Sequence, residues 1–252
     1  MHLSQRFGYL MYPLVFLVSL SAPKLLAQNS TSAPAGQQQS SQQPENPQQE
    51  QVRLAQQAQA RIRARREQRI QRTIEETYSH KFEIYGGGGY TRFRPGNHLQ
   101  HNNEAAWNAG FTDYIRPRLG ITGDIRGYYG TAFTGLNPFN IFQPNITEYT
   151  FMGGPQYRIV RKEKWAVSGQ VLVGVAKGIF NANSAQLPGT LVGLWPSGTK
   201  LTVNAGVPID YNLSPGLAVR LTPNYWLTTF GSTTQTKNLG FTAGVVVRFG
   251  SR

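Results

Sequence analysis

The sequence contains no cysteine, which excludes disulfide bonds, thiolate metal sites and a catalytic cysteine. Charged residues are also scarce and make up 15% of the chain, although Lys and Arg exceed Asp and Glu by 25 to 12. Because the charged content is low, the basic excess must be local rather than spread over the whole surface. After residue 27, no run reaches the roughly 18 consecutive apolar residues of a membrane-spanning helix. If the mature chain crosses a membrane, it must cross as strands.

Residues 1–27 have the pattern of a secretory signal peptide. Arg6 supplies the positive charge, and the apolar run over residues 10–22 is too short to span a membrane as a helix. Cleavage could follow Ser21 or Ala27, and a short uncleaved anchor is the alternative. The sequence therefore predicts export.

Two segments of different composition follow. Residues 28–51 are rich in Gln, Ser and Pro, which predicts a disordered linker because such a segment buries too little apolar surface to fold. Residues 52–80 are expected to form a basic helical periplasmic segment, since 52–76 contains good helix formers and neither Gly nor Pro. Its clustered arginines are Arg61, Arg63, Arg65, Arg66, Arg69 and Arg72. They could bind anionic lipid or peptidoglycan, and the alternative is a solvated spacer helix.

From residue 81 onward, the composition shifts to Gly, aromatic and β-branched residues, which is typical of β structure. About eight segments alternate between apolar residues and small or polar ones, as expected of strands with one apolar face. We expect strands at 82–92, 104–115, 119–129, 146–158, 165–176, 200–210, 216–227 and 238–249. The last is the clearest, with Leu239, Phe241, Ala243, Val245, Val247 and Phe249 on one face. Residues 81–250 are thus predicted to form an all-β, eight-stranded antiparallel up-and-down transmembrane β-barrel.

The connections between these segments alternate in length. Residues 116–118, 159–164 and 211–215 are short connections, whereas 92–103, 130–145, 177–199 and 228–237 are long ones. Outer-membrane barrels have short periplasmic turns and longer outside loops. An even number of strands then places both ends of the barrel, and the helix before it, on the periplasmic side.

The apolar faces are expected to meet lipid and the polar faces to point inward. The predicted interior network consists of Asp124, Arg126, Glu148, Arg158, Arg220 and Arg248. Eight strands leave an interior just wide enough for side chains, so a continuous pore is not expected. Because Arg outnumbers carboxylates in this set, some Arg should lie near the barrel ends or meet water.

Aromatic residues near the strand ends predict two interfacial belts. The periplasmic belt would contain Trp165, Tyr157, Tyr211 and Phe249, and the outer belt Trp107, Tyr129, Tyr149 and Tyr225. Gly86–Gly89 is not a phosphate-binding loop, because no Lys-Ser or Lys-Thr follows it and no helix begins there. Glycines in a strand instead permit curvature or make room for a bulky neighbour.

Residues 82–249 resemble the small eight-stranded outer-membrane barrels, the OmpA-like and OmpX-like transmembrane domains. The resemblance rests on the alternating strands, on the segment Leu-Gly-Ile-Thr-Gly-Asp-Ile-Arg at 119–126, and on the final strand that ends at Phe249. Phe249 is similar to the family's assembly signal, although Gly250, Ser251 and Arg252 follow it. The resemblance implies a Gram-negative outer membrane, with its lipid, lipopolysaccharide and barrel assembly machinery as partners. It implies no cofactor and no nucleic-acid partner.

A non-enzymatic role in cell-envelope integrity or surface interaction fits this pattern best, and two alternatives remain. One is a lipid A-modifying enzyme of the outer membrane, but the sequence contains no recognisable constellation of Ser and His for such an enzyme. His98 and His101 have a spacing that could ligate a metal. We nevertheless expect neither a metal site nor catalytic residues. The other is a soluble lipocalin-like barrel that carries a small ligand, with its apolar face inside.

Overall fold

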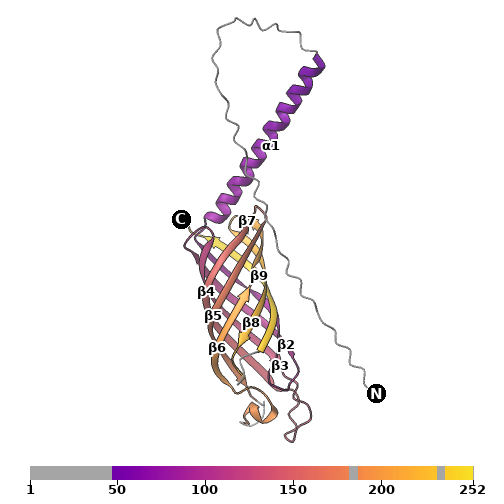
Figure 1. The fold of residues 1–252 in the computed structure, drawn as a ribbon, viewed down its shortest axis with the longest axis vertical. Coiled ribbons are helices and arrows are strands. Elements are labelled where there is room, and N and C mark those ends of the chain that lie inside the picture. The colour runs from indigo at the N-terminus through magenta and orange to yellow at the C-terminus, as the bar shows by residue number, and fades with distance from the viewer. Residues whose placement is uncertain (1–46, 182–186, 232–235, 252) are drawn as a thin grey trace, which may run out of the picture. The chain divides into compact units, whose positions relative to one another are not determined.

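The computed structural model describes residues 47–181, 187–231 and 236–251, so the predicted signal peptide and most of the predicted linker lie outside the described residues. One helix, α1 (Pro47–Ser79), precedes the strands (Figure 1). The strands are β1 (Phe82–Phe93), β2 (Asn102–Tyr114), β3 (Leu119–Thr131), β4 (Asn145–Arg161), β5 (Trp165–Phe180), β6 (Gly198–Gly206), β7 (Ile209–Ser214), β8 (Leu217–Thr228) and β9 (Thr236–Phe249). A 3₁₀ turn, η1 (Gly189–Val192), lies between β5 and β6.

The helix is longer than predicted and begins inside the segment assigned to the linker. It starts at Pro47, a residue favoured in the first turn because its missing N–H needs no partner there. Over the described parts of the chain, no helix is both long and apolar enough to cross a membrane.

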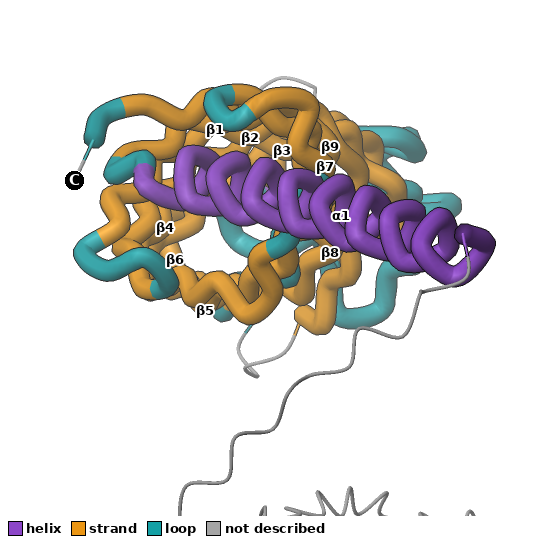
Figure 2. Tube along the Cα trace, turned by 90° about the horizontal axis from the view of Figure 1, so that it is seen from above, coloured by secondary structure: helices purple, strands orange, loops and turns teal. Residues whose placement is uncertain are grey.

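The strands form one antiparallel sheet that closes on itself, because β1 pairs with both β2 and β9 (Figure 2). At the seam, Phe82 lies opposite Phe249 and Arg92 lies opposite Leu239. β6 and β7 share one position between β5 and β8, so the ring has 8 strands. This closure confirms the predicted barrel.

The sixth predicted strand differs from expectation in two ways. It is interrupted at Pro208, which has no N–H to donate to a neighbouring strand. It then continues as β7 through Ser214, so the predicted turn at 211–215 is wrong over most of its length. Pairing of Tyr211 with Trp165 on one side and Val219 on the other holds this segment in the sheet.

Close approach of the backbones explains the glycine run in β1. A Cβ atom on Gly87 would lie 2.1 Å from the carbonyl oxygen of Ala243 on β9. A Cβ atom on Gly89 would lie 2.3 Å from the carbonyl oxygen of Phe241. The seam therefore requires glycine at these two positions.

The two ends of the barrel carry different connections. Short turns join β2 to β3, β4 to β5 and β7 to β8 at one end of the barrel. The start of β1, which follows α1, and the end of β9, which precedes the C-terminus, lie at the same end. We call it the short-turn end. The other end, the long-loop end, carries the longer connections from β1 to β2, β3 to β4, β5 to β6 and β8 to β9. The predicted alternation is confirmed.

The predicted assignment of inside and outside is also confirmed. On β3, the side chains of Ile121 and Ile125 are 56% and 41% exposed, whereas Thr122 and Asp124 between them are almost completely buried. The same alternation runs along β8 and β9. Apolar residues thus cover the outer surface and polar residues fill the interior, which is the reverse of the lipocalin-like alternative.

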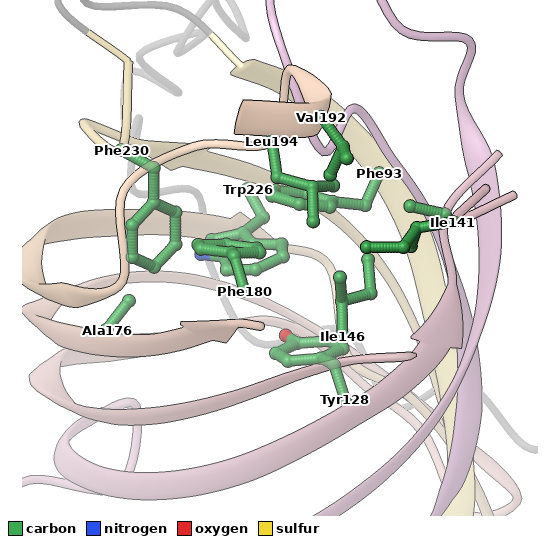
Figure 3. Packing of buried hydrophobic residues seen from close by; sticks show 11 residues of the cluster. Phe93, Tyr128, Ile141, Ile146, Ala176, Phe180, Val192, Leu194, Trp226 and Phe230 are labelled. Atoms are coloured by element: carbon green, nitrogen blue, oxygen red, sulfur yellow. The ribbon is translucent and has the colours of Figure 1, made fainter. Parts of the chain in front are cut away.

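A hydrophobic cluster that the strand pattern did not predict closes the interior toward the long-loop end (Figure 3). Tyr128 and Trp226 stack with their ring centroids 4.5 Å apart, and Phe93 stacks on Trp226 at 5.6 Å. Residues from the connections complete the cluster, among them Ile141 and Leu194. The interior is therefore ionic toward the short-turn end, whereas toward the long-loop end an aromatic cluster packs beside buried polar residues such as Glu104 and Glu148.

Candidate functional site

Glu83 is the centre of the polar cluster in the barrel interior. Its carboxylate accepts from Arg158 Nη2 at 2.6 Å, Arg248 Nε at 2.8 Å and Arg220 Nη2 at 2.8 Å. Tyr114 Oη adds a fourth hydrogen bond at 3.1 Å. One carboxylate from β1 thus joins three arginines from β4, β8 and β9 across the barrel.

Asp210 on β7 is the second carboxylate of this cluster. It accepts two hydrogen bonds from Arg220, at 2.7 and 2.9 Å, and one from Arg248 Nη2 at 2.8 Å. Asn212 Oδ1 accepts from Arg248 Nη1 at 2.8 Å. Because each arginine is both paired and hydrogen-bonded, its charge can remain in a buried position.

A smaller ionic group lies further along β3. Asp124 pairs with Arg126 on the same inward face, and Tyr85 Oη donates to Asp124 Oδ2 at 2.7 Å. Between the two ionic groups, the cavity lined by Tyr85 and Arg220 measures about 10 Å³, enough for about one water molecule.

All six residues of the predicted interior network point into the barrel and are buried. They do not form one network: Arg158, Arg220 and Arg248 come together around Glu83, Asp124 pairs with Arg126, and Glu148 stands apart from both groups. Arg158 and Arg248 do lie near an end of the barrel, as expected, but they are buried there because Glu83 and Asp210 supply the missing negative charges. Both were absent from the predicted network, although each lies at an inward position of its strand.

The C-terminal end of α1 contacts the barrel through Tyr78. Its hydroxyl donates to the carbonyl oxygen of Lys162 at 2.8 Å and accepts from Asn212 Nδ2 at 3.2 Å. The guanidinium groups of Arg158 and Arg248 lie 5.3 and 5.9 Å from the centre of its ring. Burial raises the pKa of the Tyr78 phenol, so the hydroxyl stays protonated and able to donate.

We expect Tyr78→Ala to release the end of α1 without unfolding the barrel. The substitution removes the buried ring and both hydrogen bonds, which together contribute about 2–4 kcal/mol. Limited trypsin digestion of the folded protein should then cleave near Arg72 and Lys81 faster than in the parent. Tyr78→Phe, which keeps the ring, should show a smaller increase. Equal cleavage of Tyr78→Ala and the parent would show that Tyr78 does not hold the helix.

Members of each predicted aromatic belt lie side by side. Near the short-turn end, Trp165 and Tyr211 pack edge to face with ring centroids 4.9 Å apart. Near the long-loop end, Tyr129 Oη is 3.4 Å from Trp107 Nε1 and 3.1 Å from Tyr149 Oη. Outward apolar residues in the middle of the strands, such as Ile121 and Ile125, lie between these two groups, as they do between the interfacial girdles of a membrane barrel.

The remaining predicted site residues lie outside the barrel interior. Phe249 is the last residue of β9, and its ring is 5.7 Å from that of Phe82 across the seam. Its role as an assembly signal stays a prediction. The six predicted arginines lie on α1 with exposed side chains. His98 and His101 lie in the connection between β1 and β2.

Comparison with solved structures identifies the fold. Neisserial surface protein A is 12% identical, with a TM-score of 0.50, over 67% of this chain and 97% of its own. The outer membrane protein OprG from Pseudomonas aeruginosa is also 12% identical, with a TM-score of 0.50, over 69% of this chain and 99% of its own. Ail, the attachment invasion locus protein of Yersinia pestis, is 17% identical with a TM-score of 0.45, over 67% and 97% of the two chains.

No protein-family model matches the sequence, and no curated protein is significantly similar to it. The likeness to solved structures nevertheless agrees with the closed sheet, the apolar outer band and the polar interior. The chain therefore has the fold of the small eight-stranded outer-membrane β-barrels.

Proposed function

We propose that this protein is a non-enzymatic, non-conducting outer-membrane barrel that displays its long loops at the cell surface and anchors a basic helix in the periplasm. The observation that supports this role is the filled interior. The cluster around Glu83 occupies it toward one end and the aromatic cluster around Trp226 toward the other. A barrel filled in this way is a membrane anchor rather than a pore.

The orientation follows from the connections. Short turns face the periplasm and long loops face outward in outer-membrane barrels. The short-turn end therefore belongs on the periplasmic side, and α1 is joined to that end through Lys81 and Tyr78. At 1.5 Å per residue, a helix of 33 residues extends about 50 Å, a useful length for reaching a periplasmic surface.

The arginines of α1 are arranged to meet such a surface. At 100° per residue, Arg61, Arg65, Arg69 and Arg72 fall within an arc of about 80° on the helix. Their side chains are exposed. A cationic stripe of this kind attracts anionic headgroups by about 1 kcal/mol per basic residue. The partner proposed for α1 is therefore anionic: peptidoglycan or acidic lipid.

Co-sedimentation of the detergent-solubilised full chain with isolated peptidoglycan, and separately with anionic vesicles, tests this anchoring. Changing all six arginines to Gln should abolish binding at low salt while the barrel still assembles. Changing all six to Lys keeps the charge and should preserve most of the binding. Binding by the parent should also weaken as salt is added.

Two double variants test whether the position of the arginines matters as well as their total charge. Arg65→Gln with Arg69→Gln should weaken binding more than Arg63→Gln with Arg66→Gln, although both variants lose two charges. If the protein with six Gln residues binds both surfaces as well as the parent, the arginines only solubilise the helix and the anchoring role fails.

A further inference from the structure

Two buried carboxylates, Glu104 and Glu148, lie apart from the arginine clusters. Glu104 projects inward from β2 and Glu148 from β4, on either side of β3. Their cross-strand partners on β3 are Gly130 and Tyr128, which are consecutive inward positions. The side chains of Glu104 and Glu148 are therefore neighbours in the interior, next to the aromatic cluster.

Among the described residues, neither of these carboxylates forms an ion pair. Both oxygens of Glu148 and Oε2 of Glu104 have no hydrogen-bond partner. The two residues are 0% and 1% exposed. Glu83, equally buried, has three guanidinium groups around it. A pair of ionised buried carboxylates without a cation is costly, so this pair must either take up protons or bind a cation that the described side chains do not provide.

A further oxygen atom without a partner lies beside the pair. Asn102 donates from Nδ2 to Glu104 Oε1 at 3.2 Å, but its Oδ1 has no partner. Asn102 is more than nine-tenths buried. Carboxylate and amide oxygens therefore lie together at this place.

We propose that Glu104 and Glu148 bind a divalent cation of the calcium type inside the barrel, with Asn102 as a neutral oxygen ligand and water molecules completing the coordination. Two carboxylates match the charge of a divalent ion. A donor set made only of oxygen favours a hard cation, and Ca²⁺ accepts six to eight such ligands in flexible geometry, some of them water, whereas Mg²⁺ requires a near-ideal octahedron. Bound there, the ion would join β2 to β4 across β3.

A groove at the barrel rim lies next to this site. It measures about 530 Å³ and is lined by Asn102, Gly130 and Tyr129. Asn102 lines this groove and donates to Glu104, so it separates the groove from the carboxylates. Gly130 lets the backbone of β3 approach Glu104 closely, because a Cβ atom there would lie 2.5 Å from Cγ of Glu104.

Terbium luminescence of the full chain in phosphatidylcholine vesicles free of lipopolysaccharide tests the proposal. After treatment with a chelator, TbCl₃ should bind one ion per chain. Tyrosine excitation should sensitise its emission, because Tyr128 is the cross-strand neighbour of Glu148, and CaCl₂ should displace the ion. Glu104→Gln and Glu148→Gln should each abolish this signal. Asp113→Asn, which removes a half-exposed carboxylate near the short-turn end, should preserve it.

A measurement on the parent protein alone guards against variants that fail to fold. CaCl₂ should raise the thermal unfolding temperature of the chelator-treated protein, and a chelator should lower it again. Absence of both saturable terbium emission and a calcium-dependent shift would overturn the proposal. So would unchanged emission in folded Glu148→Gln.

Discussion

Glu83→Gln is expected to lower the free energy of unfolding of the barrel in lipid by about 3–5 kcal/mol, the cost of breaking a buried ion pair by removing one partner. The side chain keeps its shape but loses the charge shared by Arg158, Arg220 and Arg248. Asp210 contacts only the last two of these. The guanidinium of Arg158 would then be buried without a carboxylate. Urea unfolding in phosphatidylcholine vesicles measures the change.

Asp113→Asn is the control for this prediction, because it removes a half-exposed carboxylate that lies 4.0 Å from Lys81 Nζ. Exposed pairs of this kind contribute about 0–1 kcal/mol. Adding Arg158→Gln to Glu83→Gln removes the orphaned charge and should restore part of the loss. If Glu83→Gln is as stable as the parent, the buried ionic cluster does not hold the barrel together.

The second large effect is expected on the outer surface. Ile125→Arg should lower the free energy of unfolding by about 2–4 kcal/mol, the cost of placing Arg at the midplane of a bilayer on the lipid face of a barrel. On β3, Ile125 lies between Leu119, which pairs with Tyr157 of one belt, and Tyr129 of the other. It is therefore close to the middle of the apolar band. Folding into vesicles, followed by urea titration, measures the loss.

Leu119→Arg provides the matched comparison on the same strand and the same face. Near the interface an arginine costs only about 0–1 kcal/mol, because its side chain can reach the headgroups. A steep difference between positions 119 and 125 is thus expected. Equal costs at the two positions would mean that the belts do not mark the edges of the membrane.

The sequence pattern predicts most of the architecture because two of its signals are strictly geometric. Side chains alternate along a strand, so the faces of β3, β8 and β9 follow directly from the residues. Connection lengths alternate because an up-and-down barrel has two different ends. The alternation does not reveal whether Pro208 interrupts a strand or ends it. The sequence therefore predicts a turn where β7 continues to Ser214.

The composition of the interior was harder to predict. Glu83 lies at the second residue of its strand, and only strand parity and the register with β9 show that it points toward Arg248. Asp210 follows Pro208, where the strand is broken. The aromatic cluster was missed for a different reason: Phe93, Phe180 and Phe230 come from strand ends and connections, where alternation no longer separates lipid from interior. Only the three-dimensional structure shows that Glu83, Asp210 and the aromatic residues meet inside the barrel.

Single-channel recording in planar lipid bilayers shows whether the filled interior prevents ions from crossing the barrel. Full-length protein would be reconstituted after its heat-modifiable migration confirms that it is folded. Because charged pairs around Glu83 and the aromatic cluster around Trp226 fill the interior, we expect no conductance steps above the lipid baseline. Stable, reproducible conductance steps from the folded protein would contradict this expectation.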